Sequence, residues 1–137
     1  MRVISGKYGG RKLVSFSADH IRPTSDRVKE SLFNKLSAYW DGARVLDLFS
    51  GTGNLSFEAL SWGATSVDAV ELNPKSLAIV KKNQELLGVG SELRVHKADV
   101  LKFLANYSGA PFEVILIDPP FTEKMAHEVM IKISSSK

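Results

Sequence analysis

The chain has 137 residues, of which 44% are hydrophobic, and it carries a net charge of +3 and no cysteine. This length and composition predict one globular domain, and the lack of cysteine excludes a disulfide framework, a thiolate zinc site and a cysteine nucleophile. No signal peptide or membrane span is recognisable, which favours a cytoplasmic protein. The three histidines are scattered without metal-ligand spacing, so we expect no metal.

The basic residues are concentrated at the start of the chain. Residues 1–40 carry eight Lys or Arg and three Asp or Glu, whereas residues 41–137 carry ten and twelve. Such a segment is typical of a polyanion-binding surface, and an ordinary solvated surface is the alternative. We therefore expect an RNA-contacting segment at 1–40 and a catalytic domain at 41–137. The residues expected to contact RNA are Arg2, Lys7, Arg11, Lys12, Arg22 and Arg27.

The first predicted elements lie in this basic segment. Met1–Leu13 is expected to form a hairpin that turns at Gly9-Gly10. A helix is predicted at roughly residues 25–39, after the candidate caps at residues 24–26. The apolar side chains that recur there at helical spacing are Val28, Leu32, Leu36 and Tyr39, with Phe33 and Trp40 beside them.

From residue 41 onward, apolar runs alternate with amphipathic stretches. Strands are predicted at Arg44–Phe49, Ser66–Val70, Leu93–His96 and Phe112–Ile117. Helices are predicted at Leu55–Trp62, Pro74–Leu87, Val100–Tyr107 and Glu123–Ile133. The alternation indicates βαβ units, and so an α/β fold with a parallel sheet covered by helices.

A glycine-rich turn follows the first predicted strand, at Ser50-Gly51-Thr52-Gly53. Glycines at such a turn let the backbone approach a ligand, but the spacing alone also suits a dinucleotide. Asp47 precedes the turn, at the end of the strand. A pyrophosphate gains nothing from a carboxylate there, whereas the ammonium group of S-adenosylmethionine does; capping of the turn is the alternative role for Asp47.

Two further carboxylates follow the next strands. Glu71 can accept hydrogen bonds from both hydroxyls of a ribose, which S-adenosylmethionine and NAD share. Asp99 can accept from an adenine amino group or cap the next helix. The expected donor pocket consists of Asp47, Phe49, Ser50, Gly51, Gly53, Glu71, Leu72, Asp99 and Val100.

The segment Asp118-Pro119-Pro120-Phe121 follows the fourth predicted strand. The two prolines stiffen the loop and remove two N–H donors. Asp118 and the Pro119 carbonyl can accept the two hydrogens of an exocyclic amine, and Phe121 can stack on the base. Holding both hydrogens directs the nitrogen lone pair at the methyl donor, so we expect these four residues to be catalytic.

This loop resembles the fourth motif of methyltransferases that modify amino groups of nucleic-acid bases. The segments Met1–Leu13, Arg22–Asn34 and Leu46–Gly53 resemble the bacterial 16S rRNA guanine 2-amino methyltransferase family, and the likeness covers nearly the whole chain. The resemblance implies a Rossmann-like class I methyltransferase fold and S-adenosylmethionine as the donor. It also implies 16S rRNA, or the small ribosomal subunit, as the substrate.

The chain ends at Lys137, where members of that family continue into further strands. We therefore expect the carboxy-terminal strands to be missing and Phe112–Ile117 to form an open edge. An unpaired apolar edge favours strand pairing between molecules, so we expect reduced stability and a dimer formed through the fourth strand.

Three other functions fit parts of the sequence. A non-catalytic RNA-binding or assembly module would keep the fold without turnover. A DNA adenine methyltransferase would share the Asp118–Phe121 loop but should lack the basic segment. A nicotinamide dehydrogenase would explain Gly51, Gly53 and Glu71 but would leave Asp47 and Asp118–Phe121 without a role.

Overall fold

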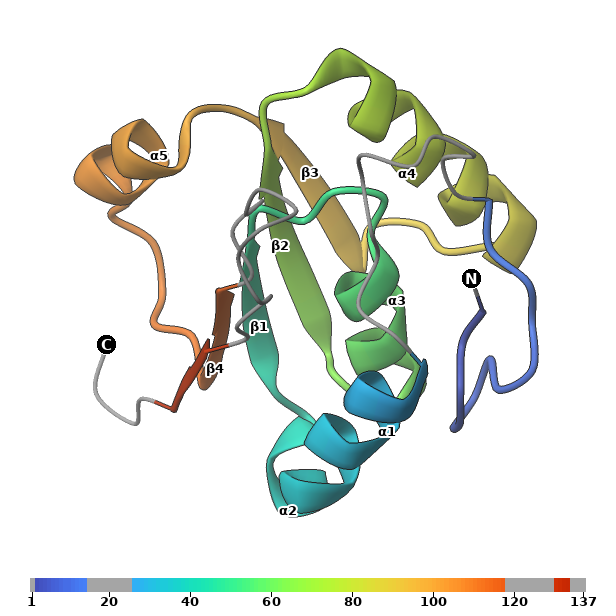
Figure 1. Cartoon of the computed structure of the whole chain (residues 1–137). Coiled ribbons are helices and arrows are strands. Elements are labelled where there is room, and N and C mark those ends of the chain that lie inside the picture. The colour runs from blue at the N-terminus through green and yellow to red at the C-terminus, as the bar shows by residue number, and fades with distance from the viewer. Residues whose placement is uncertain (1, 15–25, 118–129, 134–137) are drawn as a thin grey trace, which may run out of the picture.

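The computed structural model describes residues 2–14, 26–117 and 130–133. Its centre is a five-stranded sheet in the order β3-β2-β1-β4-β5 (Figure 1). The strands are β1 (Arg44–Leu48), β2 (Ser66–Glu71), β3 (Leu93–Lys97), β4 (Val114–Ile117) and β5 (Met130–Ile133). The first four pair in parallel and β5 pairs antiparallel with β4. The predicted parallel sheet is confirmed, and its first strand lies in the middle.

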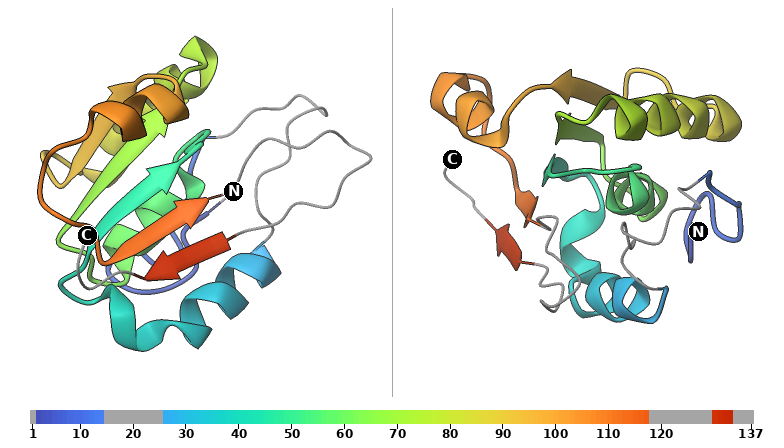
Figure 2. Two further views of the ribbon diagram at one scale, coloured as in Figure 1. Left: turned by 90° about the vertical axis from the view of Figure 1, so that its left-hand side faces the viewer. Right: turned by 45° about the horizontal axis from the view of Figure 1, so that its top comes forward.

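Helices cover both faces of this sheet (Figures 1 and 2). They are α1 (Asp26–Lys35), α2 (Ser37–Trp40), α3 (Asn54–Ser61), α4 (Pro74–Leu87) and α5 (Val100–Asn106). α5 lies on one side and the other helices lie on the opposite side. From β1 to β4, all predicted bounds agree with the structure within two residues. None of the described helices has the length and apolar character needed to cross a membrane.

The side chains of the strands alternate between two apolar clusters, as a period of two requires. Val45 of β1 lies in the larger cluster and Leu46 in the smaller one, beneath α5. The larger cluster also contains Val3 and Trp40, from the expected RNA-contacting segment. The described parts of residues 1–40 and 41–137 therefore share one core, and an RNA-contacting role for residues 1–40 stays a prediction.

The predicted helix at 25–39 is interrupted in the structure. Leu36 adopts φ −109° and ψ 22° between α1 and α2. The Phe33 carbonyl accepts a hydrogen bond from the Trp40 indole N–H at 3.1 Å, and the two rings stack 4.2 Å apart. A continuous helix would use that carbonyl for a backbone N–H four residues later. The break between α1 and α2 thus coincides with the hydrogen bond from the Trp40 indole and with the stacking of Trp40 on Phe33.

The predicted hairpin is a compact loop with little strand character. Residues 2–14, here called the amino-terminal arm, form one isolated antiparallel bridge, between Arg2 and Lys12. The Val3 N–H donates to the Arg11 carbonyl at 2.9 Å, and the Gly10 N–H donates to the Val3 carbonyl at 2.8 Å. The arm therefore turns back on itself as expected, but most hydrogen bonds of its backbone are made with residues outside the arm.

Two expectations for the end of the chain are wrong. Residues 130–133, expected at the end of a helix, form strand β5, and residues 123–129 lie outside the described part. β5 pairs with β4 from Val114↔Ile133 to Ile117↔Met130. β4 is thus an inner strand and not an open edge, which removes the basis for a dimer formed through it. The β-branched residues Ile131 and Ile133 favour the strand.

Candidate functional site

The loops that follow the parallel strands meet at the carboxyl edge of the sheet, where ligands of such folds bind. The Ser50 N–H after β1 donates to the Val70 carbonyl at 3.1 Å, and the Ala98 N–H after β3 donates to the Glu71 carbonyl at 3.1 Å. Strand β2 thus holds the loops on both of its sides. The predicted donor-pocket residues of β1, β2 and β3 are brought together here.

The glycine-rich turn needs glycine for steric reasons. Gly51 and Gly53 have φ of 58° and 88°, and a Cβ at Gly53 would lie 2.6 Å from the Phe57 ring. A Cβ at Gly51 would meet nothing within 4 Å. Gly53 therefore allows α3 to pack against the loop, whereas Gly51 leaves open space beside it. Phe49 also adopts a positive φ, 59°, and packs on the smaller core cluster.

Asp47 is buried below this turn. Its carboxylate is 1% exposed and accepts a hydrogen bond from the Ser56 hydroxyl of α3 at 2.6 Å. This contact joins β1 to α3, whereas the alternative role of Asp47, capping of the turn, stays a prediction. Contact with a donor ammonium stays a prediction for Asp47.

Glu71 joins two of the loops. Its Oε1 accepts from the Gly51 N–H at 2.8 Å and its Oε2 accepts from the Asn73 N–H at 3.0 Å. Each carboxylate oxygen has a second lone pair, so both can still accept from a ribose hydroxyl. The half-buried carboxylate lies beside the glycine-rich turn and is already oriented.

Asp99 is the N-cap of α5, and its Oδ2 accepts from the Lys102 N–H at 3.2 Å. The capping role is confirmed, and contact with an adenine stays a prediction. Val100 packs on the smaller core cluster, while Leu72 is 55% exposed at the end of β2. An exposed leucine there can cover an adenine ring.

The residues at this edge fit S-adenosylmethionine. The Ser50 hydroxyl is buried and has no hydrogen-bond partner among the described residues. A buried hydroxyl of this kind is costly unless a ligand or water bonds to it. Two carboxylates, Asp47 and Glu71, match the ammonium and the ribose of the donor.

The expected catalytic residues Asp118, Pro119, Pro120 and Phe121 lie outside the described residues, as does Arg22. The last described residue before them, Ile117, pairs with Leu48 of β1. Leu48 immediately precedes the turn that contains Phe49 and Ser50. The chain therefore enters the Asp118–Phe121 segment from the edge that carries the candidate donor pocket.

The described basic residues of the expected RNA surface all lie at the surface: Arg2, Lys7, Arg11, Lys12 and Arg27. Lys7 lies over the Tyr8 ring at 5.3 Å, and the Arg11 guanidinium donates to the Leu86 carbonyl of α4 at 2.9 Å. Contact with RNA stays a prediction for all of them.

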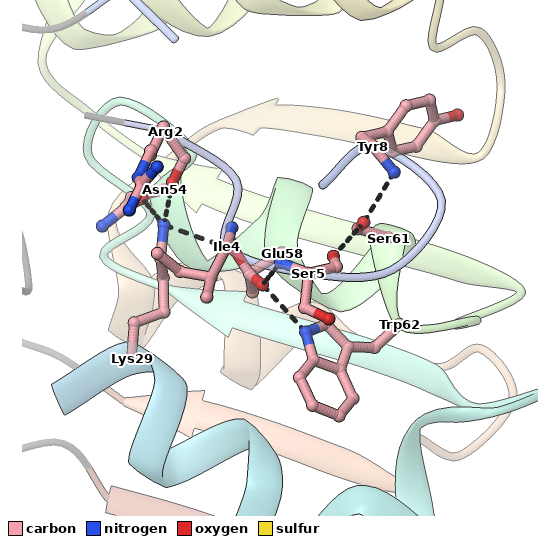
Figure 3. Close-up of polar contacts among 9 residues, drawn as sticks. All are labelled: Arg2, Ile4, Ser5, Tyr8, Lys29, Asn54, Glu58, Ser61 and Trp62. Carbon is pink, nitrogen blue, oxygen red and sulfur yellow. Dashed lines mark hydrogen bonds and ion pairs between the residues drawn. The ribbon is translucent and has the colours of Figure 1, made fainter. Parts of the chain in front are cut away.

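Sequence reasoning missed three buried polar residues next to the site: Lys29, Glu58 and Asn83. Lys29 Nζ lies 3.3 Å from Glu58 Oε1 and 2.6 Å from Asn54 Oδ1, at the start of α3 (Figure 3). Asn83 of α4 donates to the Thr52 carbonyl in the glycine-rich turn. The available signal was Glu58 itself, which is the one charged residue in the sequence of α3.

The family described as Conserved hypothetical protein 95 matches the chain over residues 1–137. The chain belongs to this family. A relative named "Ribosomal RNA small subunit methyltransferase D" from Haemophilus influenzae is 40% identical over 132 residues, which cover 95% of this chain and 68% of the relative. The relative of the same name from Escherichia coli K12 is 36% identical, with 95% and 65% covered. The chain thus spans about two thirds of their length.

Solved structures of methyltransferases share the fold. The proposed methyltransferase yhhF of Escherichia coli superposes with a TM-score of 0.78 at 36% identity, over 92% of this chain and 67% of that one. SMU.776, a proposed methyltransferase solved with SAH, superposes with a TM-score of 0.58 at 28% identity, over 76% of this chain and 27% of that one. Together with the strand order, these matches establish the Rossmann-like class I methyltransferase fold.

Replacing Glu71 with alanine is expected to weaken S-adenosylmethionine binding by about 1–3 kcal/mol, since two ribose hydroxyls lose their acceptor. Titration calorimetry of the folded variant measures the change. Glu85→Ala, an exposed carboxylate of α4, is the control and should bind like the unmodified protein. Equal affinities for Glu71→Ala and the unmodified protein would remove Glu71 from the donor pocket.

Proposed function

We propose that this protein transfers the methyl group of S-adenosylmethionine to the exocyclic 2-amino group of a guanine in 16S rRNA. The broader activity, S-adenosylmethionine-dependent methylation of rRNA, follows from the family and the fold together. The 2-amino group of guanine is the finer part of the proposal. We place the reaction in the cytoplasm, where bacterial ribosomes assemble.

One observation carries the proposal: Glu71 holds the glycine-rich turn at the edge of the sheet from which the chain enters Asp118–Phe121. A donor bound against Gly51 and Glu71 would therefore lie next to the segment assigned to the base. The donor supplies an electrophilic methyl group.

We assign the orientation of the base to the Asp118–Phe121 segment. An exocyclic amine is a poor nucleophile because its lone pair is delocalised into the ring. Asp118 and the Pro119 carbonyl accept the two amine hydrogens, which turns the lone pair out of the ring plane, and Phe121 stacks on the base. Positive charge that develops on nitrogen would be stabilised by the same acceptors as the N–C bond forms and the bond from sulfur to the methyl group breaks. The amine would then lose one proton, so the products would be the N-methylated base, S-adenosylhomocysteine and a proton.

Methyl transfer to rRNA tests this proposal. The protein is incubated with methyl-labelled S-adenosylmethionine and either free 16S rRNA or small ribosomal subunits that lack the modification, and the rRNA is digested to nucleosides. We expect the label in N2-methylguanosine. Label in another nucleoside would refute the 2-amino assignment, and rRNA binding without transfer would favour the non-catalytic module.

RNA binding is expected to depend steeply on salt, because Lys and Arg side chains that neutralise phosphates release counterions. Replacing Lys7 or Lys12 with alanine should flatten the plot of log affinity against log salt by about one for each phosphate that is no longer neutralised. The exposed Lys102 of α5 lies outside the basic segment, so Lys102→Ala is the control. Filter binding at several salt concentrations measures the slope, and an affinity independent of salt would make the arm an ordinary surface.

A further inference from the structure

The amino-terminal arm is built onto α3 by bonds between arm backbone and polar side chains of the helix (Figure 3). Glu58 Oε1 accepts from the Ile4 N–H at 2.8 Å, and the Ser61 hydroxyl oxygen accepts from the Tyr8 N–H at 2.8 Å. The acceptors lie on the helix that starts directly after Gly53. The arm is therefore an extension of the element that carries the glycine-rich turn.

Asn83 of α4 connects the far end of the arm to the turn itself. Its Oδ1 accepts from the Val14 N–H at 2.6 Å, and its Nδ2 donates to the Val14 carbonyl at 3.0 Å and to the Thr52 carbonyl at 3.2 Å. The side chain is 0% exposed. Both amide hydrogens and the amide oxygen are thus used, and all three bonds go either to the arm or to the turn.

Lys29 provides a second connection at the other end of the arm. Its Nζ donates to the Arg2 carbonyl at 2.5 Å and to Asn54 Oδ1 at 2.6 Å (Figure 3). Asn54 follows Gly53 directly. The arm is therefore tied at both ends to residues on either side of Gly53, namely Thr52 and Asn54.

We infer that Asn83 is a positioning residue that couples donor binding to RNA binding by the arm. This inference rests on the proposed function, in which Gly51 and Gly53 line the donor pocket and Lys7 and Lys12 contact RNA. A donor that binds to the turn fixes the position of the Thr52 carbonyl. Because Asn83 bonds to both Thr52 and Val14, the position of Val14 is then fixed as well. RNA therefore binds to an arm that is already ordered through Asn83, so the donor and the RNA each tighten the binding of the other.

The coupling is measured with S-adenosylhomocysteine, which cannot donate a methyl group, and with 16S rRNA. The Kd of each is determined with and without the other. In the unmodified protein we expect each to tighten the other by the same factor, between about 5 and 150, because linkage is reciprocal. A factor of one, with both ligands bound, would overturn the inference and leave the proposed function standing.

The variant Asn83→Asp tests whether the coupling between the two ligands depends on Asn83. The aspartate keeps the acceptor for the Val14 N–H but has no N–H for the Val14 and Thr52 carbonyls. We expect the coupling factor to fall to within about twofold of one, with smaller changes in the Kd of either ligand alone. The control is Gln84→Ala, at the neighbouring position of α4, which removes the hydrogen bond from the Gln84 side chain to the Leu93 carbonyl. This variant should keep the coupling factor of the unmodified protein. A full factor in Asn83→Asp would overturn the inference.

Hydrogen exchange tests the same link without any substitution. Adding S-adenosylhomocysteine alone should slow exchange of the Val14 N–H, although Val14 is not part of the proposed donor pocket. Unchanged exchange at Val14 in the ligand-bound protein would overturn the inference. Failure of the unmodified protein to bind S-adenosylhomocysteine would overturn the proposed function, and this inference with it.

Discussion

Replacing Asp118 with alanine is expected to reduce methyl transfer to rRNA by about 100- to 1,000-fold, the usual effect of removing one preorganised group that stabilises developing charge. The alanine cannot accept an amine hydrogen, so the nitrogen lone pair stays delocalised in the base. Single-turnover transfer with saturating donor and rRNA measures the reduction directly. Binding of S-adenosylmethionine should change by less than about threefold, because Asp118 is assigned to the base.

Asp118→Asn is the matched variant, because its amide oxygen keeps one acceptor at the same distance from the backbone. We expect it to retain more activity than Asp118→Ala. A rate for Asp118→Ala within about threefold of the unmodified protein would contradict the role of Asp118 as an acceptor for the amine.

Replacing Lys29 with methionine is expected to destabilise the fold by about 3–5 kcal/mol, since it leaves the Glu58 carboxylate buried without its cation. Both side chains are at most 1% exposed, so water cannot take over the role of Lys29. The Arg2 carbonyl and Asn54 Oδ1 lose a donor as well. Urea unfolding of the variant and of the unmodified protein measures the difference.

The control for Lys29→Met is the double variant Lys29→Met/Glu58→Gln, in which the unpaired charge is also removed. The amide of the introduced glutamine can still accept a hydrogen bond from the Ile4 N–H, and it keeps the shape of the Glu58 side chain. We expect it to recover part of the stability. A Lys29→Met protein within about 1 kcal/mol of the unmodified one would show that the buried pair is not needed.

Much of the fold could be predicted because local signals agreed with the tertiary structure. For α4, Pro at the first position and Gly88 after the last predicted the bounds Pro74–Leu87 that the structure shows. Gly88 adopts the left-handed conformation with φ 68°. The edge of the sheet that carries Glu71 could be predicted for the same reason, since β1, β2 and β4 are short, mainly apolar runs with a polar residue at or just after their ends.

The side of α1 that faces the core could not be predicted in full. Helical spacing puts Val28 on the apolar stripe, but Val28 is 49% exposed, whereas the neighbouring Lys29 is fully buried. A buried lysine is rare unless it is paired. Its partner, Glu58, is far away in the sequence, so nothing local to α1 indicates the pairing.

Strand β5 was missed for a related reason. Four residues are too few to show a strand period, and Met130–Ile133 is a strand because it pairs with β4. Strand formation depends more on neighbouring strands than helix formation does. Contacts at long sequence separation thus account for both errors.

Titration of the protein with S-adenosylmethionine and, separately, with NAD tests the central claim most directly. Both ligands contain a ribose that Glu71 could bind, so only the remainder of each molecule distinguishes a methyltransferase from a dehydrogenase. We predict one molecule of S-adenosylmethionine bound per chain and no detectable binding of NAD under the same conditions. Binding of NAD in preference to S-adenosylmethionine would contradict the assignment of this edge of the sheet as a methyl-donor site.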